Sequence, residues 1–278
     1  MGDSRTGFIK PQNKMQLKLR DKLEFVLQNS TIFPARRASE DNMRQLLESL
    51  WPRKPKDRLI RVGPDSDGGY VLPDNFSGIR ACISPGVSDE SGFELACAEM
   101  GMEVYLADKS VEGPALEHPR FHFRKEFVGV GDGFLSLDRW AQLEGLSGTS
   151  DDLLLQMDIE GAEYEALLAL SMDLQNRFRY MVIEFHRLDQ WWSLGYFDLV
   201  SAVFRKLNST HRCVHLHPNN CSGALKQGDL VFPRLMEFTF CRLDLVEDGQ
   251  FLSQFPLPID RENTDRCPLP LPDCWYKK

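Results

Sequence analysis

The chain of 278 residues lacks several features that would assign it to a class at once. No window approaches the ~20 apolar residues that a membrane-spanning helix needs. The N-terminal stretch Met1–Gly7 contains no apolar segment, so we expect no signal peptide. The seven cysteines are odd in number and form no CxxC pair. This pattern favours buried thiols in a reducing cytoplasm over a disulfide framework.

Positive charge is also scarce outside the first part of the chain. The net charge is -8, yet residues 1–62 carry 14 Lys and Arg against 7 Asp and Glu, and the remainder carries 19 against 34. An acidic body argues against general nucleic-acid binding. The basic residues within 1–62 could bind an anionic substrate, a phosphorylated carrier or a membrane surface. Alternatively, they could form the solvated face of short helices.

The residue pattern predicts three parts. Residues 1–57 form a helical extension, in which Lys14–Gln28 partly fits a helix and Ser39–Trp51 fits one better, with Ser39 as its cap. Residues 58–254 form the main domain, without internal repeats or low-complexity tracts. The tail, residues 255–278, is rich in proline and is expected to be extended packing or disorder.

Strands and helices alternate through the main domain. The predicted strands are Ala81–Ser84, Glu103–Asp108, Phe121–Val128, Leu153–Asp158, Tyr180–His186, Cys213–His217 and Leu235–Arg242. Helices are expected at Asp89–Met100, Ser136–Leu146 and Gly195–Leu207. The number of strands and their alternation with helices predict an α/β fold. We expect one Rossmann-like, doubly wound sheet of seven strands, with an N-terminal helical layer. An earlier Asp67-Gly68-Gly69 turn predicts a hairpin, or a glycine turn that lets the backbone approach a ligand.

The most informative stretch is Leu153–Leu170, in which an apolar strand, an acidic turn and a helix follow one another. Asp158 ends the strand, where α/β sheets bind their ligands. Glu160 and Glu163 around Gly161 can be explained as caps of the following helix. That explanation does not account for an acid at the end of an apolar strand, so we expect Asp158 to belong to a functional site.

A second candidate site follows the first predicted strand. Ser84, Gly86 and Ser88 form a turn, and Phe93 and Glu94 begin a helix, an arrangement that can bind an anion or a nucleotide-like ligand. The turn has one glycine where a dinucleotide fingerprint has three. Asp108 closes the second strand about twenty residues later, where an acid can accept both ribose hydroxyls; alternatively it is a cap or turn residue.

Two further strand ends carry polar residues in alternation. Glu184 and His186 share one face of their strand, and His215 and His217 share one face of theirs. If these strands are neighbours, the side chains converge with Asp158 at one sheet edge. Asp158, Glu184 and His217 are therefore candidate ligands of a divalent cation, or members of an acid–base group. The alternative is that the histidines are hydrogen-bonded core residues.

Several of these blocks, in this order, resemble the FkbM family of S-adenosylmethionine-dependent methyltransferases over about residues 58–245. The blocks are Asp67–Tyr70, Ser84–Ser88 with Phe93 and Glu94, Ala107–Ser110, Leu155–Tyr164, Ile183–His186 and His215–Asn220. The resemblance implies a class I methyltransferase fold whose last strand is antiparallel. It implies cofactor contacts from the Ser84–Ser88 turn and Asp108, and a substrate side near Asp158 and Glu184. The chain has Ser88 where a second glycine is common in the family.

We therefore expect an O-methyltransferase that uses S-adenosylmethionine, with a divalent cation as a second candidate cofactor, and acts on a hydroxyl of a sugar, glycan or other small molecule. The expected cofactor-binding residues are Ser84, Gly86, Ser88, Phe93, Glu94, Asp108, Lys109 and Ser110. The expected catalytic residues are Asp158, Glu184, His186 and His217. Two alternatives stay open: a non-catalytic scaffold with a cofactor-type fold, which the Ser88 departure motivates, and a metal-dependent hydrolase built on the Asp, Glu and His residues.

Overall fold

The structure is a computed structural model that describes Lys22, residues 35–88 and residues 90–277. The chain divides into two compact units, residues 1–37 and 38–278. The helix expected at Lys14–Gln28 lies outside the described residues, apart from Lys22. The unit 38–278 joins the helix near Ser39, the α/β domain and the C-terminal tail, so its start does not coincide with the expected boundary at residue 57.

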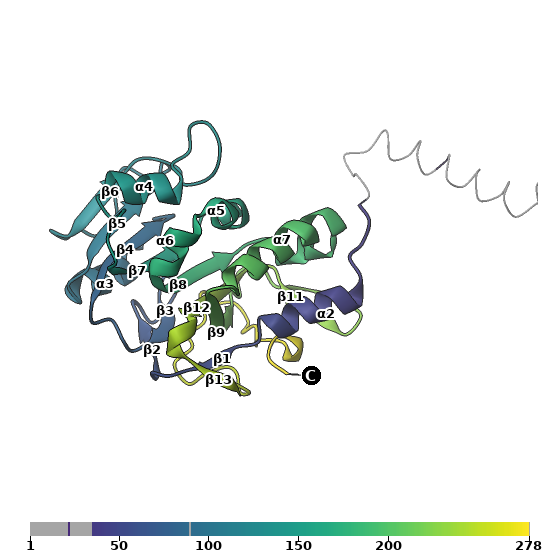
Figure 1. Cartoon of the computed structure of the whole chain (residues 1–278). Coiled ribbons are helices and arrows are strands. Elements are labelled where there is room, and N and C mark those ends of the chain that lie inside the picture. Colours follow the sequence, from purple (N-terminus) through teal and green to yellow (C-terminus); the bar gives the residue numbers. More distant parts are fainter. Residues whose placement is uncertain (1–21, 23–34, 89, 278) are drawn as a thin grey trace, which may run out of the picture. The chain divides into compact units, whose positions relative to one another are not determined.

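A sheet of seven strands forms the centre of the unit 38–278 (Figure 1). Its strands are β4 (Ile79–Pro85), β5 (Glu103–Ala107), β6 (Phe121–Arg124), β7 (Asp152–Met157), β8 (Phe178–Phe185), β9 (His211–Pro218) and β12 (Met236–Arg242). Their order across the sheet is β6-β5-β4-β7-β8-β12-β9. The strands from β6 to β8 pair in parallel, whereas β12 pairs antiparallel with both β8 and β9. The prediction of a mostly parallel seven-strand sheet is confirmed.

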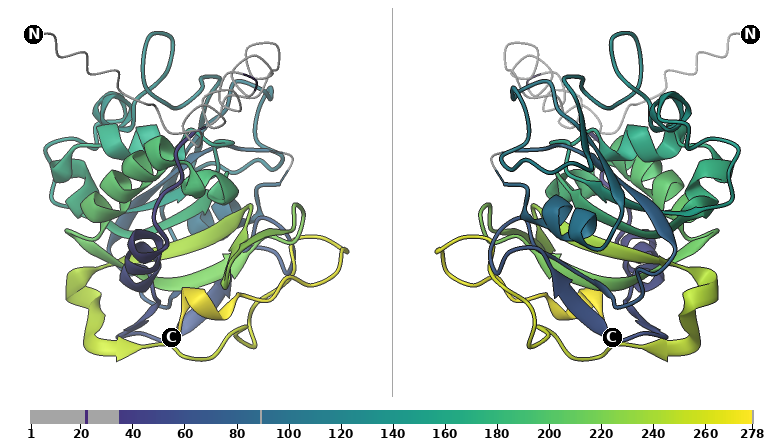
Figure 2. Two further views of the ribbon diagram at one scale, coloured as in Figure 1. Left: turned by 90° about the vertical axis from the view of Figure 1, so that its right-hand side faces the viewer. Right: turned by 90° about the vertical axis from the view of Figure 1, so that its left-hand side faces the viewer.

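Helices and a hairpin bury the two faces of the sheet in separate cores (Figures 1 and 2). The larger core lies under α2 (Glu40–Ser49), α4 (Leu137–Leu143), α5 (Glu163–Ala169), α6 (Met172–Arg177) and α7 (Leu194–Leu207). The smaller core lies under α3 (Gly92–Glu99) and the hairpin of β2 (Leu59–Val62) and β3 (Tyr70–Pro73). Because successive strand residues point to opposite faces, each buried strand contributes to both cores.

The sequence accounts for the local structure of these elements. Leu153, Leu154 and Leu155 of β7 are fully buried, as a strand covered on both faces requires. The hydroxyl of Ser39 accepts a hydrogen bond from the backbone of Asn42, which confirms Ser39 as the cap of α2. Strand β6 ends at Arg124, four residues before the expected end. Helix α6 was not predicted.

The proline-rich tail is packed against the domain. Trp275, in a short 3-10 helix (Asp273–Trp275), is fully buried and donates a hydrogen bond to the carbonyl of Val231. Val231 belongs to the hairpin of β10 (Ala224–Gln227) and β11 (Leu230–Pro233). Strand β1 (Arg53–Pro55) pairs with β13 (Val246–Phe251), which precedes the tail. Within the described residues, the end of the tail thus packs against the β10–β11 hairpin.

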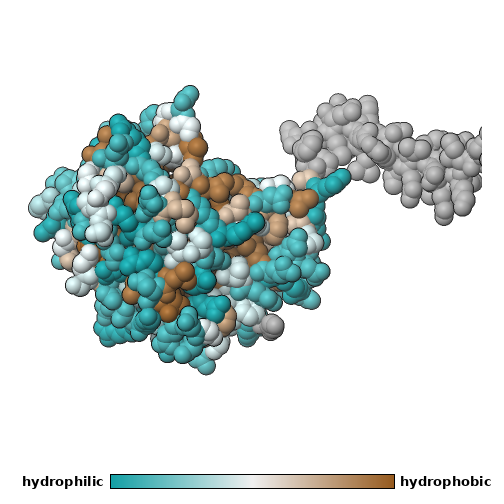
Figure 3. Space-filling view, viewed as in Figure 1, coloured by the Kyte–Doolittle hydropathy of each residue, from teal (hydrophilic) through white to brown (hydrophobic). Residues whose placement is uncertain are grey.

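On the face that Figure 3 shows, the surface of the unit is mostly hydrophilic, with apolar areas between the polar ones. Phe127, Val130 and Phe134 are each about half exposed and belong to the segment after β6. Among the described residues, no helix combines the length and apolar character that crossing a membrane requires.

Candidate functional site

The candidate site lies along the edge of the sheet where β4, β5, β7 and β8 have their carboxyl ends. These strands are parallel, so the segments that follow them meet at one rim. Strand order reverses between β4 and β7, and open α/β sheets bind ligands in the crevice at such a point. The rim brings together Gly86, Asp108, Asp158 and His186, which follow the four strands.

Gly86 closes the turn after β4 directly against β7. Its φ of +90° is in the left-handed region, and a Cβ at this position would lie 1.5 Å from the carbonyl oxygen of Asp158. The backbone of Asp158 donates to the carbonyl of Pro85 (3.1 Å), and that of Gly86 donates to Ala107 (3.0 Å). The turn therefore joins three strand ends. A polar cavity of about 40 Å³ opens beside it, lined by Asp67, Gly68, Tyr70, Gly86, Ser88, Glu90, Glu94, Gln156 and Asp158.

Three of the expected cofactor-binding residues lie behind this turn, in the interior. The Ser84 hydroxyl is fully buried, 2.5 Å from Glu94 and 2.6 Å from Gln156. Burial raises the pKa of Glu94, and the hydrogen bond from the Ser84 hydroxyl opposes this shift. The ring of Phe93 packs edge-on against Tyr70. Ser84 and Phe93 therefore support the turn from inside, whereas Ser88 is exposed beside the cavity.

The other expected cofactor-binding residues follow β5. One carboxylate oxygen of Asp108, Oδ1, accepts hydrogen bonds from both the backbone (2.7 Å) and the hydroxyl (2.6 Å) of Ser110. Within the described part of the chain, Oδ2 of Asp108 accepts none. Lys109 is exposed, with its Nζ 6.0 Å from the ring of Phe127. The residues after β5 thus place a partly free carboxylate at the strand end next to the Gly86 turn, and Lys109 lies beside the exposed ring of Phe127, which follows β6.

Asp158, Glu160 and His186 form one group, whose ligand atoms lie within 4.8 Å of one another. Nε2 of His186 is 3.3 Å from Glu160 and 3.8 Å from Asp158. Oδ1 of Asp158 is buried and, among the described residues, has no hydrogen-bond partner. Burial raises the pKa of Asp158 to about 7, although the nearby His186 lowers it. The group thus holds a carboxyl whose pKa lies near neutral pH beside an imidazole.

Glu163 positions the imidazole of this group. Its fully buried carboxylate is 3.1 Å from Nδ1 of His186 and accepts hydrogen bonds from the backbones of Ile159 and Gly161. Burial alone would lower the pKa of His186, but the hydrogen bond that its imidazole donates to Glu163 and the surrounding carboxylates raise it above its usual value. The sequence pattern predicts Glu163 as a helix cap, which explains its bonds to the turn but not its contact with His186.

The turn that carries this group is conformationally constrained. Glu160 and Arg187 have φ values of 57° and 60°, which non-glycine residues rarely adopt. Gly161 has a φ of +105°, and a Cβ there would lie 2.9 Å from the Arg187 side chain. The segments after β7 and β8 are therefore packed against each other, and this packing holds His186 beside Asp158.

Glu184 belongs to a second acidic group. It lies with Asp67 and Glu237, whose ligand atoms are within 4.8 Å of one another. Asn219 donates to Glu184 (3.1 Å), and Asn263 from the tail donates to both Asp67 (2.8 Å) and Glu237 (2.7 Å). Burial raises the pKa of Glu237 to about 8 and that of Glu184 well above its usual value. Glu237 is not among the residues predicted from the sequence, because its importance depends on which strands are neighbours.

The expectation that His217 joins Asp158 and Glu184 is wrong. It assumed that β8 and β9 are adjacent, but β12 lies between them, and Glu237 is the residue paired with both Glu184 and His217. His217 is three strands from Asp158, roughly 14 Å at ~4.8 Å per strand. The candidate metal ligands Asp158, Glu184 and His217 therefore do not form one site. His215 is bound to Asp260 (2.9 Å), as a satisfied core histidine would be.

No model of a known protein family matches the chain, and no curated protein matches it either. The functional interpretation therefore depends on the geometry of the rim. The donors present fit two kinds of group: a carboxylate and a glycine turn at adjacent strand ends fit an adenosine-type cofactor, and Asp158, Glu160 and His186 fit a divalent cation.

Proposed function

We propose that the protein is an S-adenosylmethionine-dependent methyltransferase that acts on a hydroxyl group of a sugar, glycan or other small molecule. The observation that carries the proposal is the junction of β4, β5 and β7, where the Gly86 turn, Asp108 and Asp158 meet at the point of strand reversal. An antiparallel last strand in a seven-strand sheet supports the class I methyltransferase form of the Rossmann-like fold.

The residues after β4 and β5 would hold the cofactor. Asp108 has a carboxylate oxygen available for ribose hydroxyls, because Ser110 occupies only the other one. The exposed rings of Phe127 and Phe134, which stack on each other, offer an apolar surface for the adenine ring. When bound, the sulfonium of the cofactor supplies an already activated methyl group. The protein then has to align the acceptor and exclude water, which can contribute ~7–11 kcal/mol.

The acceptor hydroxyl must also lose its proton, and His186 is the residue best placed to accept it. Glu163 takes the Nδ1–H hydrogen bond, which leaves Nε2 directed toward Asp158 and Glu160 at the rim. A positioned base of this kind typically contributes 10²–10⁴-fold to a rate. Asp158 lies between the glycine turn and His186, so it would orient the acceptor hydroxyl.

The direct test is titration calorimetry with S-adenosylmethionine, followed by a labelled-methyl transfer screen over sugars, nucleotide sugars and small alcohols. We expect binding by the wild-type protein and binding at least ~10-fold weaker for Asp108→Ala, since two charge-assisted hydrogen bonds are lost. Asp198→Ala, at an exposed position of α7, is the matched control. Lack of binding at millimolar cofactor would reject the proposal and favour the scaffold alternative.

A metal-dependent hydrolase is the second candidate, which the Asp158, Glu160 and His186 group favours. These three residues would hold the cation, which can acidify a bound water or hydroxyl. Glu163 on Nδ1 of His186 resembles the carboxylate that commonly orients a metal-binding histidine. Hydrolysis that is lost on chelation, in a protein that binds no methyl donor, would support this candidate. A methyltransferase can use the same cation, so chelation is tested in both assays.

A further inference from the structure

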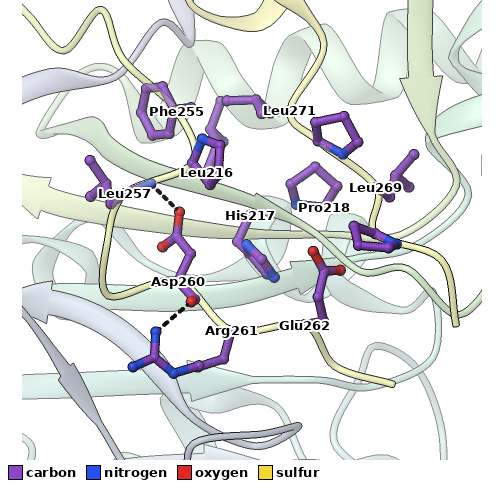
Figure 4. Close-up of a pocket in the computed structure, with 13 residues that line it drawn as sticks. Leu216, His217, Pro218, Phe255, Leu257, Asp260, Arg261, Glu262, Leu269 and Leu271 are labelled. Atoms are coloured by element: carbon purple, nitrogen blue, oxygen red, sulfur yellow. Dashed lines mark hydrogen bonds between the residues drawn. The ribbon is translucent and has the colours of Figure 1, made fainter. Parts of the chain in front are cut away.

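A cavity separate from the rim lies between β9 and the C-terminal tail (Figure 4). Its volume is about 160 Å³. Apolar side chains form most of its wall, among them Pro218, Phe255, Leu257, Leu269 and Leu271. His217, Arg261 and Glu262 line the opposite part, and Figure 4 shows the imidazole of His217 between the apolar and the charged side chains.

Two polar atoms that line this cavity have no partner among the described residues. Nε2 of His217 and Oε2 of Glu262 are both buried and make no hydrogen bond. His217 itself is only 6% exposed. The neighbouring polar groups are already satisfied: Asp260 binds His215 and the backbone of Leu257, and Arg261 donates to the carbonyls of Pro258 and Asp260.

Unpartnered buried polar atoms are costly, at about 1–3 kcal/mol each, and native proteins rarely keep two of them in one place without a ligand or water. Burial lowers the pKa of His217 to about 4, against the attraction of Asp260, so the imidazole is neutral at neutral pH. A neutral imidazole nitrogen and a carboxylate oxygen can both accept a hydrogen bond. The cavity therefore suits a ligand that presents donors on one side and an apolar face on the other.

We propose that this cavity binds one six-membered ring that carries neighbouring hydroxyl groups, as a sugar ring does. The size agrees, because an apolar cavity of about 150 Å³ accepts benzene. The prolines and leucines would pack against the C–H face of the ring, and His217 and Glu262 would accept the hydroxyl protons. The lining also holds Asp260 and Glu262 beside Arg261, so a cationic amine is the competing class of ligand, and the experiment includes one.

This site does not depend on the proposed methyl transfer. The cavity borders β9, three strands from Asp158, and none of its lining residues belongs to the Gly86 turn or to the His186 group. It can therefore be tested without a cofactor. If the cavity binds no diol, the proposal of methyl transfer at the rim is unaffected. If the protein binds no methyl donor, the proposal for the cavity is unaffected.

The probe is trans-1,2-cyclohexanediol, titrated into the full chain and followed by ligand-observed NMR. We expect a dissociation constant in the millimolar range, as for other ligands of this size. The dimethyl ether of the same diol keeps the ring but has no donors, and we expect it to bind at least ~10-fold more weakly. His217→Phe should weaken diol binding at least ~5-fold, whereas the matched control His118→Phe should leave it unchanged.

Leu269→Trp fills the cavity from the less buried tail and should abolish diol binding. The Leu269→Trp variant also tests the proposal if the His217→Phe protein does not fold. The proposal is overturned if the ether binds as tightly as the diol, if cyclohexylamine binds more tightly, or if Leu269→Trp leaves binding unchanged. Absence of diol binding by the folded wild-type protein would likewise overturn it and assign the cavity to water.

Discussion

Glu184 of β8 and Glu237 of β12 lie directly opposite each other on two antiparallel strands, and both carboxyl groups are buried. Like charges in such a position repel, and burial penalises each charge further. Burial is the main reason that both pKa values are raised; the charges of Asp158 and Glu237 add to it at Glu184, and the amides of Asn219 and Asn263 only partly compensate. Glu237 therefore keeps its proton at a pH where most carboxyls are ionised.

This pair predicts an unusual pH dependence of stability. A carboxyl whose pKa is raised on folding stabilises the protein below its unfolded pKa, and that contribution is lost as the pH rises through the folded value. With folded pKa values of about 7 for Asp158 and about 8 for Glu237, the free energy of unfolding should fall between about pH 5 and pH 8.

Chemical denaturation across this pH range, in the presence of a chelator, measures the slope. Glu237→Gln should reduce the slope and raise the stability at pH 8, by an amount on the order of 1–3 kcal/mol. Glu117→Gln, at an exposed position, is the control and should change neither the slope nor the stability at pH 8. A Glu237→Gln protein with the wild-type slope would show that Glu237 is ionised throughout.

The contact between Glu163 and His186 predicts separate effects on rate and on pH profile. His186→Asn should lower methyl-transfer turnover by roughly 10²–10⁴-fold, because the base is lost. Glu163→Gln keeps the shape but removes the charge that raises the pKa of His186. The acidic limb of the pH–rate profile should then move to lower pH.

Cofactor affinity should stay near wild type in both variants, since neither residue belongs to the Asp108 side of the rim. His122→Asn, at an exposed histidine paired with Glu103, is the control for turnover. Full activity of His186→Asn on the true acceptor would contradict its role as the base.

Gly86→Ala should destabilise the protein strongly. The substitution adds a methyl group 1.5 Å from the carbonyl oxygen of Asp158, in addition to the cost of a positive φ. Gly133→Ala separates the two effects, since Gly133 also has a positive φ (85°) but a Cβ there meets nothing within 4 Å. We expect about 1–2 kcal/mol for Gly133→Ala and a clearly larger loss for Gly86→Ala, measured by urea denaturation. Equal losses would mean that the turn can move away from β7.

The tail predicts a further effect on stability. Trp275 is fully buried among Trp191, Phe232 and Phe238, so Trp275→Ala should cost roughly 3–5 kcal/mol. Leu243→Ala, at a residue that is 40% exposed, should change the stability by less than about 1 kcal/mol. The midpoint temperature of thermal unfolding, measured for both variants and the wild type, tests this difference in stability. A tail that contributes nothing would leave Trp275→Ala as stable as the control.

Local patterns were sufficient for the elements whose residues interact with their sequence neighbours. The apolar run before Asp158 predicts β7, and the Asp67–Gly69 turn predicts the hairpin of β2 and β3. The carboxyl ends of parallel strands share one edge in any α/β sheet, so the positions of Gly86, Asp108 and Asp158 at the rim also followed from the sequence.

By itself the sequence determined the seven-strand sheet and the acids at its rim, because burial pattern and strand ends are properties of short segments. Only the tertiary structure decided that β12 separates β8 from β9, which moves His217 away from Asp158 and brings Glu237 beside Glu184. It also decided that Glu163 holds His186 and that Asn263 of the tail bridges two acids. These contacts join segments distant along the chain, and strand pairing and packing, which no local pattern encodes, select them.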